Sequence, residues 1–203
     1  MNADKASEEL KVIRQLMERP IRYSTMSGVS AILAGCTALA GLAADWHFWI
    51  RYGPKTAVRI NILVWAGVFA VALAAVVVLT RLRERTRGMP AWSRVKTRIL
   101  LTIGAPFIAA VGLTFAVVYQ WYGGPFVAQA SLVPAIWMLF YGVALWQLGE
   151  YSPVEVRILG AAFILAGLIV GAFLQWQPYL ALGATFGGFH LIYGAIVCVR
   201  YGG

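Results

Sequence analysis

Six long apolar runs constrain this chain more than any other feature of its sequence. They comprise residues 24–45, 60–80, 99–120, 126–148, 156–175 and 179–199. A helix needs about 20 predominantly apolar residues to cross the hydrocarbon core of a bilayer. The runs are continuously apolar and lack the alternation of a membrane β-barrel. The sequence therefore predicts an all-α, polytopic membrane protein with six transmembrane helices.

The overall composition leads to the same class. Of the 203 residues, 61% are hydrophobic and only 12% are charged, whereas soluble domains carry about 25% charged residues. A globule of this size has too much surface to hide so many apolar side chains from water. Because the loops between the runs are short, residues 24–203 are predicted to form a single transmembrane domain with no attached soluble domain.

The basic residues are distributed unevenly between the two ends of the predicted helices. The N-terminal arm, residues 81–98, Arg157 and the C-terminus carry 14 Lys and Arg, whereas the opposite side carries only Arg51, Lys55 and Arg59. Cytoplasmic loops are enriched in Lys and Arg. We therefore expect a protein of the bacterial inner membrane with both termini in the cytoplasm. This asymmetry accounts for the net charge of +9, so no nucleic-acid partner is needed to explain it.

Residues 1–23 are predicted to form a separate cytoplasmic segment. Leu10, Ile13 and Met17 fall on one helical stripe before Pro20 ends the pattern. This predicts a short amphipathic helix on the membrane surface or against the bundle. The segment mixes acids with bases and precedes a run long enough to span, which is not typical of a secretory signal.

The runs also show an internal repeat. Arg98-Ile-Leu begins the third run and Arg157-Ile-Leu begins the fifth, while Tyr141-Gly142 and Tyr193-Gly194 lie in the fourth and the sixth. One interpretation is a set of three pseudo-repeated helical hairpins arranged in parallel. The alternative is that every spanning helix favours Arg at its inner end and Trp at its outer end.

His190 lies inside an apolar run, in the stretch GGFHLIYG. Gly183, Gly187 and Gly194 are seven and three residues before it and four residues after it, on the same helical face. A glycine stripe lets a neighbouring helix approach closely, so we expect His190 and Tyr193 in a helix seam. A charge is costly there, which favours a neutral imidazole bonded to a backbone carbonyl or to a hydroxyl of another helix. The alternative is a role as proton relay or ligand.

Small residues recur in other runs. Gly167 and Gly171 form a GxxxG pair in the fifth run, and Ser27, Ala31 and Gly35 repeat every four residues in the first run. Such patterns are typical of close helix packing in membranes. They predict tight contacts within the chain or with partner proteins.

A group of polar residues is expected near the outer boundary of the membrane. Asp45, His47, Arg59 and Asn61 fall at one level there. One interpretation is an interfacial ion pair that fixes a loop, and the other is the mouth of a substrate path. His47 and His190 are separated by about half a bilayer, roughly 15 Å, and cannot share a metal ion.

Residues 81–98 contain seven basic residues and one acid. The basic residues are Arg81, Arg83, Arg85, Arg87, Arg94, Lys96 and Arg98. Their first role is to set the topology. A second expected role is docking of lipid headgroups or of an acidic partner, because each base near an anionic leaflet contributes about 1 kcal/mol.

Motifs of the common catalytic classes are absent from the sequence. It has no GxSxG, HExxH or P-loop pattern, and its acids do not pair at mid-membrane depth. Cys36 and Cys198 lie in different runs without CxxC spacing. We therefore expect no enzyme, no metal site and no identified cofactor. The 8 Trp, 9 Tyr and 10 Phe would suit a bound lipid, quinone or pigment, or simply bulky packing.

Four stretches cover much of the chain: ELKVIRQLMER, YSTMSGVSAILAG, LFYGVALWQLGEYSPVEVRILG and FGGFHLIYGAIVCVRY. With their Tyr141-Gly142 and their closing His190, Tyr193 and Gly194, they resemble a family of small, uncharacterised six-transmembrane-helix bacterial membrane proteins. The similarity extends over nearly the full length. The resemblance implies six helices, and it brings no activity and no catalytic residue.

Two functional interpretations follow. The first is a non-enzymatic accessory, scaffold or regulatory subunit of a larger membrane complex, such as a respiratory or photosynthetic assembly, with lipids and other membrane subunits as partners. Glycine seams and the scarcity of ionisable groups within the membrane favour it. The second is a small-solute transporter or channel, for which His190, Pro106 and Pro134 are candidate positions.

Overall fold

The computed structural model describes residues 28–88, 92–120, 132–174 and 177–201. These residues form the helices α2 (Gly28–Thr86), α3 (Arg94–Gln120), α5 (Leu132–Leu148), α6 (Val154–Phe173) and α7 (Pro178–Tyr201), with no strand among them. The expectation of an all-α chain is confirmed for this part. The amphipathic helix expected within residues 1–23 lies outside the described residues.

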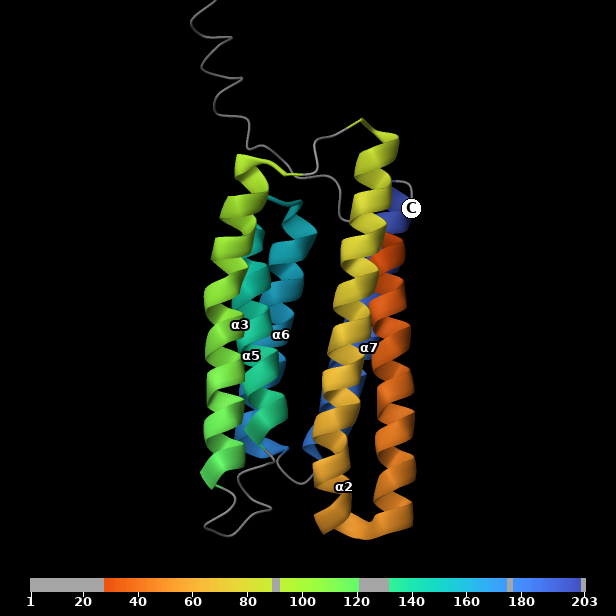
Figure 1. The fold of residues 1–203 in the computed structure, drawn as a ribbon, viewed down its shortest axis with the longest axis vertical. Coiled ribbons are helices and arrows are strands. Elements are labelled where there is room, and N and C mark those ends of the chain that lie inside the picture. Colours follow the sequence, from red (N-terminus) through yellow and green to blue (C-terminus); the bar gives the residue numbers. More distant parts are fainter. Residues whose placement is uncertain (1–27, 89–91, 121–131, 175–176, 202–203) are drawn as a thin grey trace, which may run out of the picture.

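Helix α2 consists of two arms that fold back on each other (Figure 1). The first arm is Gly28–Gly53 and the second arm is Ile60–Thr86. Gly53 has φ 71° and ψ 173° and interrupts the helix between them. Only glycine adopts such a positive φ readily, because it has no Cβ. The turn therefore depends on this residue.

The described helices have the length and apolarity of membrane spans. Within the described residues, five helices are long and apolar enough to cross: both arms of α2, together with α3, α6 and α7. Helix α5 is apolar but has 17 residues, which is near the lower limit for a span. The chain is therefore a multi-pass helical membrane protein. The sixth crossing stays a prediction, since the first residues of the run 126–148 lie outside the described residues.

The helices form two groups in Figure 1. In one group, α5 packs extensively against α6, and α3 packs against α5. In the other group, α2 packs extensively against α7. Smaller contacts of α7 with α5 and α6 join the groups. The expected hairpin of the last two runs is thus a minor contact, and the repeat of three hairpins stays a prediction.

Glycine builds both extensive contacts. A Cβ added to Gly142 in α5 would lie 2.8 Å from the carbonyl oxygen of Gly160 in α6. Likewise, a Cβ added to Gly28 in the first arm would lie 2.7 Å from the carbonyl oxygen of Gly194 in α7. Lipid chains are as apolar as the side chains, so helices in a bilayer gain stability from close van der Waals contact. These two glycine seams supply it.

The boundary between the second arm of α2 and α3 is different. Within the described residues, a Cβ at Gly67, Gly104 or Gly112 would have no atom within 4 Å. The two helices are bridged at mid-height by the ring of Phe69, which lies 5.7 Å from that of Phe107. Side chains rather than backbone contacts therefore hold this boundary.

The glycine seams should tolerate no added methyl group. Gly142→Ala and Gly160→Ala place a Cβ against backbone atoms of the facing helix, and overpacking of this kind costs about 1–3 kcal/mol. Gly104→Ala is the matched control, because its Cβ meets no atom within 4 Å and alanine favours a helix by about 1 kcal/mol over glycine. Thermal unfolding in detergent should rank both seam variants below the wild type and the control at or above it. Equal loss in all three variants would contradict close contact at this seam.

Candidate functional site

His190 is buried and uses both of its ring nitrogens. Its Nδ1 lies 2.8 Å from the carbonyl oxygen of Phe186, four residues earlier on α7. A carbonyl only accepts, so Nδ1 carries the hydrogen and donates it. The Nε2 then accepts from the Tyr141 hydroxyl of α5, at 2.6 Å. This is the pattern of a neutral imidazole that ties α7 to α5.

Aromatic rings surround this pair. The ring of Phe163, from α6, lies 4.9 Å from that of Tyr141 and 5.5 Å from that of His190. The ring of Phe186 is 5.0 Å from that of Tyr141. Phe163 is fully buried. The cluster therefore joins α5, α6 and α7 where the two helix groups meet.

A second hydrogen-bonded chain continues the cluster toward α3. The Trp137 indole N–H donates to the Thr114 hydroxyl at 3.0 Å. That hydroxyl donates in turn to the carbonyl of Ala110 at 2.8 Å. The side chains of His190, Tyr141, Trp137 and Thr114 therefore all have hydrogen-bond partners within the described structure.

His190 bonds a backbone carbonyl and a tyrosine of another helix, but the seam it occupies is not the one that the three glycines form. Gly183, Gly187 and Gly194 pack against Leu42, Leu39 and Ile32 of the first arm of α2, whereas His190 faces α5 and α6. At 100° per residue, the three glycines are rotated by about 20–60° from His190 around the helix axis. The histidine therefore sits beside the glycine seam and points into the neighbouring contact.

The remaining expected seam residues have defined positions. A Cβ at Gly167 would lie 2.8 Å from Leu139 of α5, and one at Gly171 would lie 3.4 Å from Ala135. Both glycines thus belong to the contact of α6 with α5. Tyr193 is buried and lies on α7 next to Gly194.

The polar residues expected near the outer boundary do not form one cluster. Asp45 and Asn61 are buried, and Asn61 is close enough to act on the Asp45 carboxylate. His47 is exposed and its ring lies 5.8 Å from that of Phe48. The side chain of Arg59 lies outside the described residues. The described structure thus brings Asp45 and Asn61 together and leaves His47 at the surface.

Two residues that the sequence did not single out complete this buried polar group. Tyr179 of α7 is buried and lies within electrostatic reach of Asp45, and Trp65 lies one helical turn after Asn61. Buried polar atoms without a hydrogen-bond partner in the described structure are Asp45 Oδ1, Asn61 Oδ1 and Nδ2, Trp65 Nε1 and the Tyr179 hydroxyl. Among the described side chains, Asp45 makes no ion pair, so the expected loop-fixing pair is not found there. Buried polar groups are normally satisfied, which makes this group unusual.

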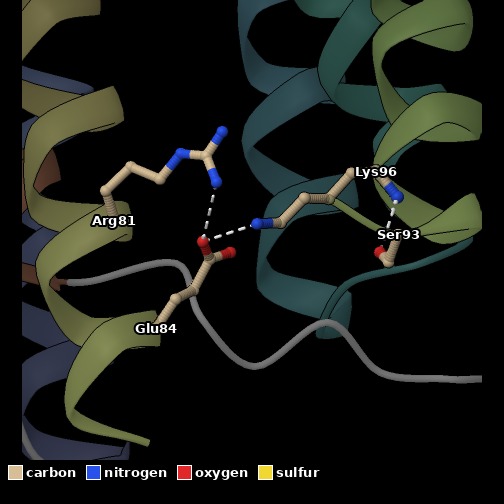
Figure 2. Close-up of polar contacts among 4 residues, drawn as sticks. All are labelled: Arg81, Glu84, Ser93 and Lys96. Carbon is tan, nitrogen blue, oxygen red and sulfur yellow. Dashed lines mark hydrogen bonds and ion pairs between the residues drawn. The ribbon is translucent and has the colours of Figure 1, made fainter. Parts of the chain in front are cut away.

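At the opposite end of the bundle, Glu84 is buried between two bases. Its carboxylate lies 2.5 Å from the Lys96 ammonium of α3 and 3.8 Å from the Arg81 guanidinium (Figure 2). The Ser93 hydroxyl accepts from the Lys96 backbone N–H at 3.3 Å at the start of α3. The carboxylate therefore fastens the end of the second arm to the beginning of α3.

The sequence contained the signal for this contact. Glu84 is the one acid among seven bases in residues 81–98, a pattern that favours an ion pair with one of them. Lys96 was expected on a docking surface, but its side chain is only 14% exposed because it turns onto Glu84. Arg85, Arg87, Arg94 and Arg98 are exposed and Arg83 is half-buried, so these remain on the surface.

The other glutamates of this end are also paired. Glu155, at the start of α6, accepts from Arg200 at 2.6 Å and from the Tyr201 hydroxyl at 3.2 Å. These contacts fix the end of α7. Glu150 forms an ion pair with Arg157. The acids near this surface therefore serve to join helices.

Among the described residues, no group of three or more His, Cys, Asp or Glu side chains is placed to hold a metal ion. Comparison of the chain with models of known protein families, with curated proteins and with solved structures finds no match. The resemblance to a six-span family therefore stays a prediction. The evidence for a function therefore comes from the residues of this chain.

The bond between Tyr141 and His190 should contribute modestly and specifically. Tyr141→Phe removes the hydroxyl and His190→Phe removes its acceptor, so each lowers stability. The double variant should lose less than the sum, with a coupling of about 0.6 kcal/mol, the average for such bonds in membranes. Unfolding in detergent of the four proteins of this cycle measures the coupling. Additive losses would show that the two side chains are not bonded.

The Glu84 ion pair should contribute more to stability than the exposed ion pair of Glu150. Glu84→Gln leaves the shielded Lys96 ammonium without its carboxylate, which costs about 3 kcal/mol, the lower end for a buried pair. Glu150→Gln is the matched control, because surface pairs contribute about 0–1 kcal/mol. The measurement is the midpoint of thermal unfolding for both variants. A control that unfolds as early as Glu84→Gln would contradict this ranking.

Proposed function

We propose that this chain is a non-enzymatic accessory or scaffold subunit of a larger membrane assembly. Its proposed location is the bacterial inner membrane, with both termini in the cytoplasm, as the distribution of basic residues favours. The host we favour is an energy-transducing complex, respiratory or photosynthetic. Its partners would be lipids and other membrane subunits.

The observation that carries the proposal is a set of glycines on the second arm of α2 and on α3 that no other described residue approaches. Gly67, Gly104 and Gly112 have no atom within 4 Å of an added Cβ. Glycine in a helix costs about 1 kcal/mol relative to alanine, and in membranes it repays that cost by admitting a neighbouring helix. Glycines 28, 35, 142, 160, 183, 187 and 194 do so inside this chain, with added Cβ atoms at 2.5–2.9 Å from their neighbours. A partner helix would give the open glycines the same role.

The surroundings of the open glycines on α3 fit such a partner. Ile108 and Phe115 flank Gly112 on one helical stripe and are 74% and 71% exposed. Two large side chains around a glycine form a ridge with a depression that a facing helix can enter. The second arm of α2 adds further exposed apolar surface, because none of the residues in its most apolar window is buried.

The aromatic core also supports a structural role. The polar side-chain atoms of His190, Tyr141 and Trp137 are all hydrogen-bonded, and two of these bonds join helices. A catalytic or transport role for His190 would require one of these bonds to break. Joining helices explains each of them without further assumption.

A second candidate function, a small-solute transporter or channel, is favoured by one observation. Asp45, Asn61 and Tyr179 bury polar atoms that lack partners in the described structure. Transporters place such groups along the path of their substrate. A scaffold role does not explain why these polar atoms are buried.

The proposal is tested by gentle solubilisation of the native membrane followed by mass measurement of the particle. We expect a complex with a second subunit in fixed stoichiometry. Gly112→Leu fills the depression on α3 and should release that subunit while the chain stays folded. Gly188→Leu is the matched control, because Gly188 of α7 is equally open but lies on another helix, and it should keep the subunit. A wild-type chain recovered alone or only with copies of itself would overturn the proposal.

A further inference from the structure

Asp45 is the one acid that the described residues hold within a span without a basic partner. It precedes Gly53 by eight residues in the first arm of α2, which places it about 12 Å along the helix from the turn. Its side chain is only 7% exposed. A carboxylate inside a membrane helix normally faces a paired cation, a cavity or a functional pathway. The question raised by Asp45 is therefore what compensates or removes the negative charge of its buried carboxylate.

The groups that face Asp45 are neutral. Asn61 comes from the second arm of α2 and Tyr179 comes from α7. On its own helix, His47 and Arg51 are both exposed, and neither forms an ion pair with Asp45 among the described contacts. No described base is thus available to compensate a carboxylate here.

A bound metal ion does not fit this group. Cations that bind oxygen take about six to eight ligands, whereas the oxygens here come only from the Asp45 carboxyl, the Asn61 amide and the Tyr179 hydroxyl. A proton needs far less, since a protonated carboxyl donates one hydrogen bond. Asn61 Oδ1 and the Tyr179 oxygen can accept this hydrogen bond, because both are buried and neither has a partner in the described structure.

We propose that Asp45 is a proton-binding site within the outer half of the membrane, formed with Asn61 and Tyr179. The Asp45 carboxylate takes up one proton to become a neutral carboxylic acid. The new O–H donates to Asn61 Oδ1 or to the Tyr179 oxygen, so the site loses a buried charge and gains a hydrogen bond. The proton leaves by the reverse step. This inference goes beyond the proposed scaffold role and does not depend on it.

The chain is well suited to a direct test because it contains only two aspartates, Asp4 and Asp45. Cell-free synthesis with carboxyl-¹³C aspartate in the Asp4→Asn variant leaves Asp45 as the single labelled carboxyl, with its surroundings unchanged. The protein is reconstituted in lipid vesicles and its infrared spectrum is recorded as a function of pH. We expect the isotope-shifted band of a carboxylic acid at neutral pH, and its conversion to the carboxylate band in alkali.

Two variants and the addition of sodium test the assignment further. Asn61→Leu removes an acceptor and should shift the frequency of the acid band, whereas Glu150→Gln, at the other end of the bundle, should leave it unchanged. A carboxylate band at neutral pH would overturn the proposal. An acid band that disappears when sodium is added at constant pH would also overturn it, since the site would then bind a metal ion. Neither outcome bears on whether a partner subunit co-purifies.

Discussion

Direct contact between helix backbones at glycine is the interaction on which this structure depends. Gly142 meets Gly160, and Gly28 meets Gly194, at distances that leave no room for a Cβ. Water is absent from the bilayer core, so apolar burial does not drive helices together there, and dense packing has to do so. In both contacts a tyrosine precedes the glycine. Tyr141 is thereby carried to the point where it meets His190 of α7.

The boundary between the second arm of α2 and α3 shows what happens without such contacts. Phe69 reaches across to Phe107 at mid-height, and Glu84 holds Lys96 at the end. The first is a contact of two flexible rings and the second is a buried ion pair, which is weak evidence for stability but costly to break. The helices on this side are consequently more exposed than those of the glycine seams, and Gly67, Gly104 and Gly112 stay open on them.

Several buried polar side chains bond to another helix, and Asp45 differs from them. His190, Trp137, Glu84 and Glu155 each form a hydrogen bond or ion pair with another helix, although the second oxygen of Glu155 has no partner in the described structure. Asp45 is buried to a similar degree, yet it faces neutral side chains whose own polar atoms lack partners. Because desolvating a charge is costly, this contrast separates groups that join helices from a group that binds something.

Length and apolarity are local properties, so the sequence by itself determined that lipid surrounds this chain and where its helices run. Only the tertiary structure decided which helices are neighbours. Periodicity gives the face of a helix but not what lies opposite, and in lipid one apolar face is as acceptable as another. Hence His190 turned to α5 instead of the glycine seam, Lys96 turned inward to Glu84, and Tyr179 joined Asp45 from a distant part of the chain.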